Sequence, residues 1–104
     1  MGRARSIVLE TRTFAKAGDA SAFFSAMLNR YSIGDRVSNA DADDLAALLK
    51  RHDELAEKIG PGIAYFEVGF PPDDYPGQCF WIVWADGGKI DFSIKHCLKR
   101  KPYD

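Results

Sequence analysis

The segment from Cys79 to Cys97, CFWIVWADGGKIDFSIKHC, constrains the fold of this chain more than any other part. Two aromatic-rich runs flank Asp86-Gly87-Gly88, and this composition predicts an antiparallel β-hairpin with a three-residue loop. We pair Ala85 with Lys89 across that loop. The pairing then sets the following residues opposite one another: Trp84 and Ile90, Ile82 and Phe92, Phe80 and Ile94.

The two faces of this hairpin differ in chemistry. Because successive side chains of a strand point to opposite sides, one face is almost wholly apolar and is expected to line the core. It carries Phe80, Ile82, Trp84, Ile90, Phe92 and Ile94. A shift of one residue would scramble both faces, so we favour this register. The other face is mixed and carries Trp81, Val83, Lys89, Asp91, Ser93 and Lys95.

Two helices are predicted before the hairpin. Apolar residues at spacings of three and four predict the first, with Asp19 as its N-cap and Tyr31 near its end. Ser38 or Asn39 caps the second, whose apolar face carries Leu45, Leu48, Leu49 and His52. The pattern resumes after residue 54 and stops at Gly60-Pro61-Gly62. A third short helix and a kinked continuation both remain open.

Strands complete the predicted topology. Residues 6–10 form a first strand, and alternation from Ala64 to Phe70 predicts another, which a proline-rich loop at 71–77 joins to the hairpin. The order is therefore one strand, two or three helices and three antiparallel strands. It predicts an α+β fold in a single domain spanning residues 1–104, with the helices packed on one face of the sheet. We expect residues 1–5 and the tail 99–104 to be flexible.

Charge is nearly balanced, with 14 Lys and Arg against 15 Asp and Glu and a net charge of −1. This balance argues against a polyanion binder that works by bulk attraction. Basic residues gather at both ends and acids in the middle, so either a basic edge lies opposite an acidic helical layer, or the ends are two solvated tails. No apolar run approaches the roughly 20 residues of a membrane span, and no signal peptide is evident, so we expect a cytoplasmic protein without membrane contact.

Catalytic and metal-binding chemistry has little support in the sequence. The two cysteines lack CxxC spacing, and our register sets Cys97 opposite Gly77, so we interpret both as packing thiols. No cofactor motif occurs, and we assign no catalytic residue, metal or cofactor.

Four polar residues are candidates for a chemical role, and each has a plainer structural interpretation or an unmet requirement. His52 is interpreted as a helix-boundary residue, because its neighbours Asp53 and Glu54 cannot face it from adjacent helical positions. His96 lacks an obvious carboxylate to orient it. Asp86 suits the turn. Asp91 and Glu67 could serve a metal-dependent hydrolase only if their strands were neighbours.

The mixed face suggests a binding platform. Single-stranded RNA is bound by aromatic rings that stack on bases, at about 1–3 kcal/mol each, and by cations that contact phosphates. The candidate residues are Tyr65, Trp81, Lys89, Lys95, Lys99, Arg100 and Lys101. No RNP-like motif or GXXG loop accompanies them. Two alternatives stay open: Trp81 packs under the 71–77 loop or the N-terminal segment, or the face binds another protein.

Three blocks of sequence together resemble the DCL family, named for plant plastid proteins (defective chloroplasts and leaves). They are Phe23 to Tyr31, Leu48 to Ile63 with its LL..H and KIG.GI patterns, and Cys79 to Cys97 with CF.IV, DG and DFS. The series covers most of residues 20–98. Each block is unspecific alone, but the ordered series is fairly specific.

The resemblance implies a stand-alone accessory domain connected with RNA. Our first hypothesis is therefore a non-enzymatic domain that binds RNA or a ribonucleoprotein through the mixed face and the basic ends. Plant members are linked to plastid ribosomal RNA processing, and the family has no established catalytic residues to carry over. This chain departs from the pattern in two places. Trp84 and Ala85 stand where an arginine is expected before the turn, which removes a phosphate-binding candidate. Asp53 replaces the usual proline after the histidine.

Overall fold

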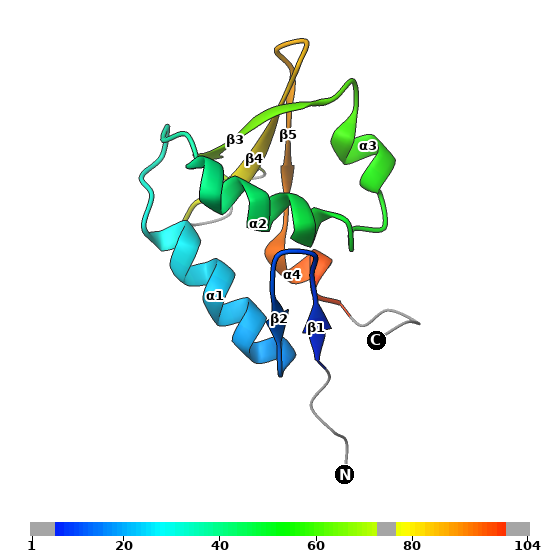
Figure 1. Ribbon diagram of the computed structural model, residues 1–104. Helices are drawn as coiled ribbons and strands as arrows, with labels where there is room; N and C mark the ends of the chain where they lie inside the picture. Colours follow the sequence, from blue (N-terminus) through cyan, green and yellow to red (C-terminus); the bar gives the residue numbers. More distant parts are fainter. Residues whose placement is uncertain (1–5, 73–76, 100–104) are drawn as a thin grey trace.

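The computed structural model describes residues 6–72 and 77–99 (Figure 1). In chain order the elements are β1 (Ile7–Val8), β2 (Thr13–Phe14), α1 (Ala17–Asn29), α2 (Asn39–Leu49), α3 (Leu55–Ile59), β3 (Ile63–Gly69), β4 (Cys79–Trp84), β5 (Lys89–Phe92) and α4 (Ile94–Cys97). The third helix is thus separate from the second.

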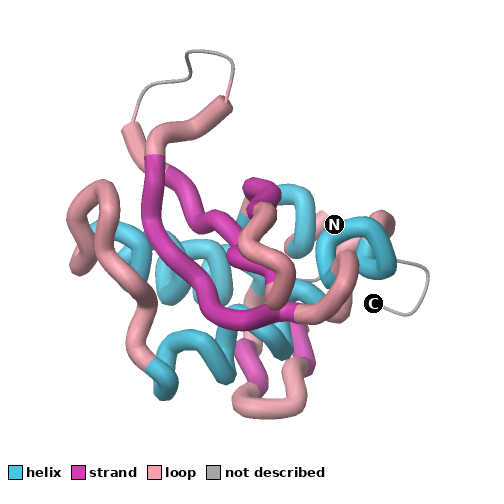
Figure 2. The backbone as a smooth tube through the Cα atoms, turned by 90° about the horizontal axis from the view of Figure 1, so that it is seen from above, coloured by secondary structure: helices cyan, strands magenta, loops and turns pink. Residues whose placement is uncertain are grey.

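The main sheet has three antiparallel strands in the order β3-β4-β5. Helix α2 lies in front of it in Figure 1, α1 runs below α2, and Figure 2 shows the same elements from above. The predicted α+β architecture, with helices on one face of an antiparallel sheet, is confirmed.

The core lies between these layers. Alternate strand residues point toward the helices and are at most 2% exposed: Phe66, Val68, Phe80, Ile82 and Phe92. They meet Phe24 and Met27 of α1 and three leucines of α2. Each fully buried side chain of this size contributes about 1.5–3 kcal/mol. The alternating pattern therefore fixes which face of the sheet is covered.

The hairpin register is shifted by two residues from the predicted one. Phe80 pairs with Phe92 and Ile82 with Ile90, while the Trp84 N–H donates to the Gly88 carbonyl at 2.7 Å. The loop is therefore residues 85–87, and Gly87 takes the left-handed conformation that ends such a loop (φ 92°). A shift of two preserves the faces, so the predicted division into apolar and mixed sides holds along the strands.

The end of the hairpin was predicted wrongly. β5 stops at Phe92, and Ser93 caps α4 by accepting a hydrogen bond from the His96 N–H at 3.2 Å. Ile94 and Lys95 are therefore helical and do not extend the strand. Cys97 is fully buried on α4 and does not lie opposite Gly77. The Ser93 side chain accepts a hydrogen bond from a backbone N–H of the helix that follows it, so these backbone groups bond within the turn and do not pair with a neighbouring strand.

The N-terminal strand does not join the main sheet. β1 and β2 form a separate two-stranded antiparallel hairpin, in which Ile7 pairs with Phe14. Ile7 is nevertheless fully buried, so its side chain anchors the small hairpin to the core. Helix α1 starts at Ala17, and Asp19 lies in its first turn rather than at the N-cap.

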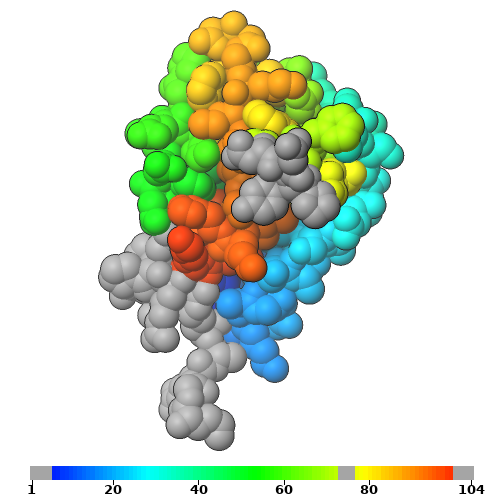
Figure 3. Space-filling model, turned by 180° about the vertical axis from the view of Figure 1, so that it is seen from behind, coloured from blue at the N-terminus to red at the C-terminus, as the bar shows by residue number. Residues whose placement is uncertain are grey.

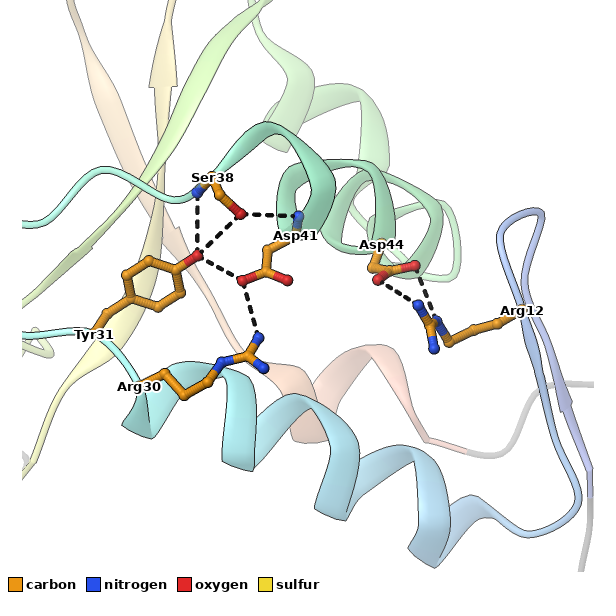
Figure 4. A network of polar contacts seen from close by, with 6 residues as sticks. All are labelled: Arg12, Arg30, Tyr31, Ser38, Asp41 and Asp44. Atoms are coloured by element: carbon orange, nitrogen blue, oxygen red, sulfur yellow. Dashed lines mark hydrogen bonds and ion pairs between the residues drawn. The ribbon is translucent and has the colours of Figure 1, made fainter.

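Polar contacts hold α2 in place (Figure 4). Ser38 is the N-cap, as predicted, and accepts from the Asp41 N–H. Asp41 also accepts a hydrogen bond from the Tyr31 hydroxyl at 2.5 Å. Asp44 accepts two hydrogen bonds from Arg12, from Nε at 3.1 Å and from Nη2 at 3.0 Å. Arg12 therefore binds the acidic helix and is no part of a basic edge opposite to it. Residues 1–5, 100 and 101 of the predicted basic ends lie outside the described residues.

Candidate functional site

The surface of the main sheet that faces away from α1 and α2 is the candidate site, and we call it the outer face. It consists of Tyr65, Glu67, Gly69, Cys79, Trp81, Val83, Lys89 and Asp91, as the strand registers place them on one side. Figure 3 views the molecule from this side. Most of these side chains are at least partly exposed, whereas Val83 is buried.

Trp81 occupies the middle of the outer face. Its indole N–H donates to the Phe70 carbonyl at 3.0 Å, and the ring lies so close to Gly69 that an added Cβ there would meet it at 3.0 Å. The indole is thus half-buried, and its contact is with the end of β3 at residues 69–70. A shallow hollow of about 320 Å³ adjoins it. At its rim, Phe70 is 72% and Ile33 40% exposed.

A cation accompanies each of the two large rings. The Arg36 guanidinium carbon lies 4.3 Å from the centre of the Tyr65 ring, and the Lys89 ammonium lies 5.7 Å from that of Trp81. Lys89 also donates to Glu67 Oε1 at 2.8 Å. The hydrogen bond to Glu67 and the charge of that carboxylate raise the pKa of Lys89. Arg36 thus lies over the Tyr65 ring, whereas the charge of Lys89, beside Trp81, is neutralised by Glu67.

Arg36 was missed by the sequence interpretation. It belongs to residues 34–37, which bond to the free edge of β3: the Gly34 N–H donates to Val68 O at 2.7 Å and the Val37 N–H to Phe66 O at 2.9 Å. Arg36 faces Glu67 in this added bridge. The segment has no alternating pattern, so nothing local in the sequence indicates that it extends the sheet.

The predicted nucleic-acid set is divided by the structure. Tyr65, Trp81 and Lys89 share the outer face, but Lys95 lies on α4. There it lines a groove of about 700 Å³ between α1, α4 and the ends of β4 and β5, which Cys79 and Asp91 of the outer face also line. Lys99 is exposed just after α4. Arg100 and Lys101 lie outside the described residues.

The two strand acids do not converge. β4 separates their strands, and Glu67 and Asp91 both pair with Trp81, from opposite sides. The hydrolase hypothesis required neighbouring strands, so it loses its basis. Across residues 6–72 and 77–99, no group of three His, Cys, Asp or Glu side chains could hold a metal ion. Burial, and then the charge of Asp91, raises the pKa of Cys79 to about 11, which keeps this thiol protonated. Asp86 accepts the Gly88 N–H at 2.9 Å within the turn.

The histidines meet at another place. His52, in the turn after α2, stacks on His96 of α4 with ring centres 4.2 Å apart. The prediction that His96 lacks a carboxylate is wrong, because Asp53 Oδ2 lies 3.4 Å from its Nε2.

The part of the chain that the structure describes contains no helix long and apolar enough to cross a membrane.

These features define a small α+β domain with a covered inner sheet face and an aromatic outer face. The chain belongs to the family described as "Protein of unknown function (DUF3223)", whose pattern matches residues 25–98. The match begins within α1 and ends just after α4, so it includes the whole main sheet and leaves out the β1–β2 hairpin.

Known relatives agree with this assignment. "Protein DCL, chloroplastic" from Solanum lycopersicum is 44% identical over 78 residues, and the "Protein DCL homolog, chloroplastic" from Arabidopsis thaliana is 39% identical over 71 residues. The matches cover 71% and 67% of this chain but only 35% and 32% of the plant proteins, so the chain spans about a third of their length.

A solved structure is also similar. The solution NMR structure of an uncharacterized protein from Rhodospirillum rubrum shares 46% identity and a TM-score of 0.81, covering 93% of this chain and 91% of that one. The resemblance to the DCL family noted from the sequence is confirmed, and so is the fold.

Proposed function

We propose that this domain acts by binding, without catalysis, and that its outer face binds single-stranded RNA. The observation that carries the proposal is the placement of two aromatic rings, each with a cation beside it, on adjacent strands. Tyr65 with Arg36 and Trp81 with Lys89 are these two units. Rings that stack on bases beside cations that contact phosphates are the common parts of single-strand platforms.

The spacing of the rings supports the proposal. Tyr65 pairs with Val83 and Trp81 with Glu67, so the two rings are diagonal neighbours on β3 and β4. Such neighbours lie about 7–8 Å apart, which suits two bases of an extended strand. The side chain of Glu67, directly opposite Trp81, accepts a hydrogen bond from Lys89, so a phosphate has to displace it from that lysine.

The test is a titration of the protein with a single-stranded oligouridylate, followed residue by residue by NMR. We expect shift changes at Tyr65, Trp81 and Arg36, and Arg36→Ala should weaken binding about tenfold, in the range of one stacked or charge-assisted contact. Lys16→Ala, which removes an exposed cation from the N-cap of α1, is the matched control and should bind normally. Equal binding by Arg36→Ala and the unmodified protein would contradict the proposal.

A protein partner is the second candidate, and the exposure of Phe70 and Ile33 beside the Trp81 hollow favours it. Aromatic side chains and arginine are enriched at such interfaces. Salt separates the two functions. RNA affinity should fall steeply with ionic strength, by about 0.7 log units per log unit of salt for each phosphate contact, whereas apolar docking should persist. Phe70→Ser should abolish a salt-tolerant interaction and leave RNA binding nearly unchanged.

A further inference from the structure

The two histidines of the chain come from the middle and the C-terminal part of the sequence, and their rings stack on each other. His52 follows α2 in the turn to α3 and is only 7% exposed. His96 lies on α4, and its ring is stacked on that of His52 at 4.2 Å with 26° between the planes. Two imidazole rings are thus in direct contact.

Backbone geometry favours a neutral His52. The Glu54 N–H donates to His52 Nδ1 at 2.9 Å, so this nitrogen acts as an acceptor and the neutral ring carries its proton on Nε2. Protonation of Nδ1 would remove the acceptor and set two N–H groups against each other. The observed hydrogen bond therefore exists only while His52 is neutral.

His96 is suited to carry a single charge. Its Nε2 atom is buried and makes no hydrogen bond within the described residues, yet Asp53 Oδ2 lies 3.4 Å away. Asp53 can therefore stabilise a positive charge on His96 by electrostatic attraction, although Nε2 and Oδ2 are not aligned for a hydrogen bond. One proton is accommodated by the pair, but a second would place two cations in stacking contact.

The surrounding charges oppose that second proton. Burial is the largest cause that lowers the pKa of His52, followed by the charges of His96 and of Lys58 on α3, while Glu54 and Asp53 act in the other direction. Arg51 adds a buried guanidinium from the same turn. On α4 itself, Lys95 and Lys99 flank His96 in sequence.

The same turn holds the end of α4. The Arg51 guanidinium donates to Cys97 O at 2.9 Å and to Lys99 O at 3.2 Å. Cys97 is fully buried and Leu98 is 6% exposed, so α4 fills part of the core. Residues 51–54 therefore retain α4 through Arg51, through the stacked rings and through the Asp53–His96 contact.

We propose that His52 and His96 form a pH-sensitive latch, which holds α4 against the turn between α2 and α3 while at least one ring is neutral and loosens it when both rings are protonated. The release is local: the main sheet keeps its pairing, while α4 separates from the turn.

Amide hydrogen exchange at pH 7.5 and pH 5.5, expressed as protection factors, tests the latch. We expect protection of the Cys97 and Leu98 amides, which close the α4 turns, to fall at least tenfold more than that of Phe80 and Ile82 in the central strand. Equal losses in both places, or no loss, would overturn the proposal.

Two variants and one unmodified measurement make the test specific. His96→Gln should reduce the pH dependence of α4 protection, because the charge of His96 no longer opposes protonation of His52 while the burial of His52 remains. Asp53→Asn should move loosening to higher pH because the counter-charge is lost. If His96→Gln does not fold, imidazole NMR titration of the unmodified protein decides. Two separated protonation steps, with α4 amide shifts following the second, support the latch, whereas two independent titrations refute it.

Discussion

The two faces of the main sheet are made by the same three strands but are organised differently. The inner face is apolar and nearly inaccessible, and its side chains belong to a core that α1 and α2 cover, together with Ile7 of β1 and Cys97 of α4. The outer face owes its arrangement to residues outside the strands: Arg36 covers Tyr65, and Phe70 receives the indole N–H of Trp81. One face therefore specifies the fold, and the other is available for binding.

Removing an inner aromatic should have the largest effect. Phe80 is 1% exposed and stacks on Phe92 at 6.0 Å between ring centres. Phe80→Ala should lower the free energy of unfolding by about 3–5 kcal/mol, because the cavity adds to the lost transfer free energy. Urea denaturation measures the change. The outer-face variant Tyr65→Ala is the control and should cost less than half as much; an equal cost would mean that the two faces do not differ.

Substitution of Gly60, the residue that ends α3, should have the next largest effect on the free energy of unfolding. Gly60 has φ 52°, and a Cβ there would meet the Trp84 ring at 2.6 Å. Trp84 is also held by its indole N–H, which donates to Lys58 O at 2.8 Å. Gly60→Ala should therefore destabilise the protein by about 1–3 kcal/mol. Gly18→Ala in α1, where a Cβ would meet nothing within 4 Å, is the matched control and should be neutral or stabilising in the same thermal melts.

The sequence predicts the inner face of the main sheet better than the outer face. Alternation identified the buried inner residues of β3, β4 and β5, because burial of one face imposes a period of two. Ala64 and Phe70, at the two ends of the predicted alternation on the first of these strands, are exposed and do not belong to the inner face. The predicted register of the hairpin differs from the observed one by two residues. The reason is that Asp86-Gly87-Gly88 permits a loop at 85–87 as well as at 86–88, and both loops leave the same side chains on each face. Helix α4 was missed because Ser93 to Cys97 continues the strand pattern, although Ser93 is a capping residue.

The outer face could be predicted only in part. Tyr65, Trp81 and Lys89 follow from strand parity, but Lys95 does not belong to the face because the strand ends at Phe92. Arg36, Ile33 and Phe70 reach it through tertiary contacts made by irregular segments, which leave no periodic signal. The His52–His96 contact likewise joins positions far apart in the chain.

Acid should weaken the fold through His52, with a smaller effect than the substitutions above. The pKa of His52 is lowered from 6.5, mainly by burial, so the unfolded chain takes up this proton before the folded one. Stability is therefore fully present above about pH 6.5 and declines as the pH falls through the lowered folded value. Urea midpoints between pH 7.5 and 5.5 measure the decline. His52→Asn, whose side-chain oxygen can still accept the Glu54 N–H, should flatten it; an unchanged slope would assign the decline to other groups.

Glu67→Gln should have the smallest effect on stability and a distinctive effect on binding. The Lys89–Glu67 pair lies at the surface, with the lysine side chain 55% exposed, so its loss should change the free energy of unfolding by less than about 1 kcal/mol. Freed from its acid, Lys89 should bind phosphate better and raise RNA affinity by up to about fivefold, the equivalent of about 1 kcal/mol.

The double variant Glu67→Gln with Lys89→Gln completes this prediction. If Glu67 acts by neutralising Lys89, removing both should cancel the gain, and the two substitutions should be non-additive in RNA binding. A gain that survives in the double variant would mean that the carboxylate acts by general repulsion. No gain in the single variant would indicate that the outer face does not contact phosphates, and binding would then have to depend on its apolar rim at Phe70 and Ile33.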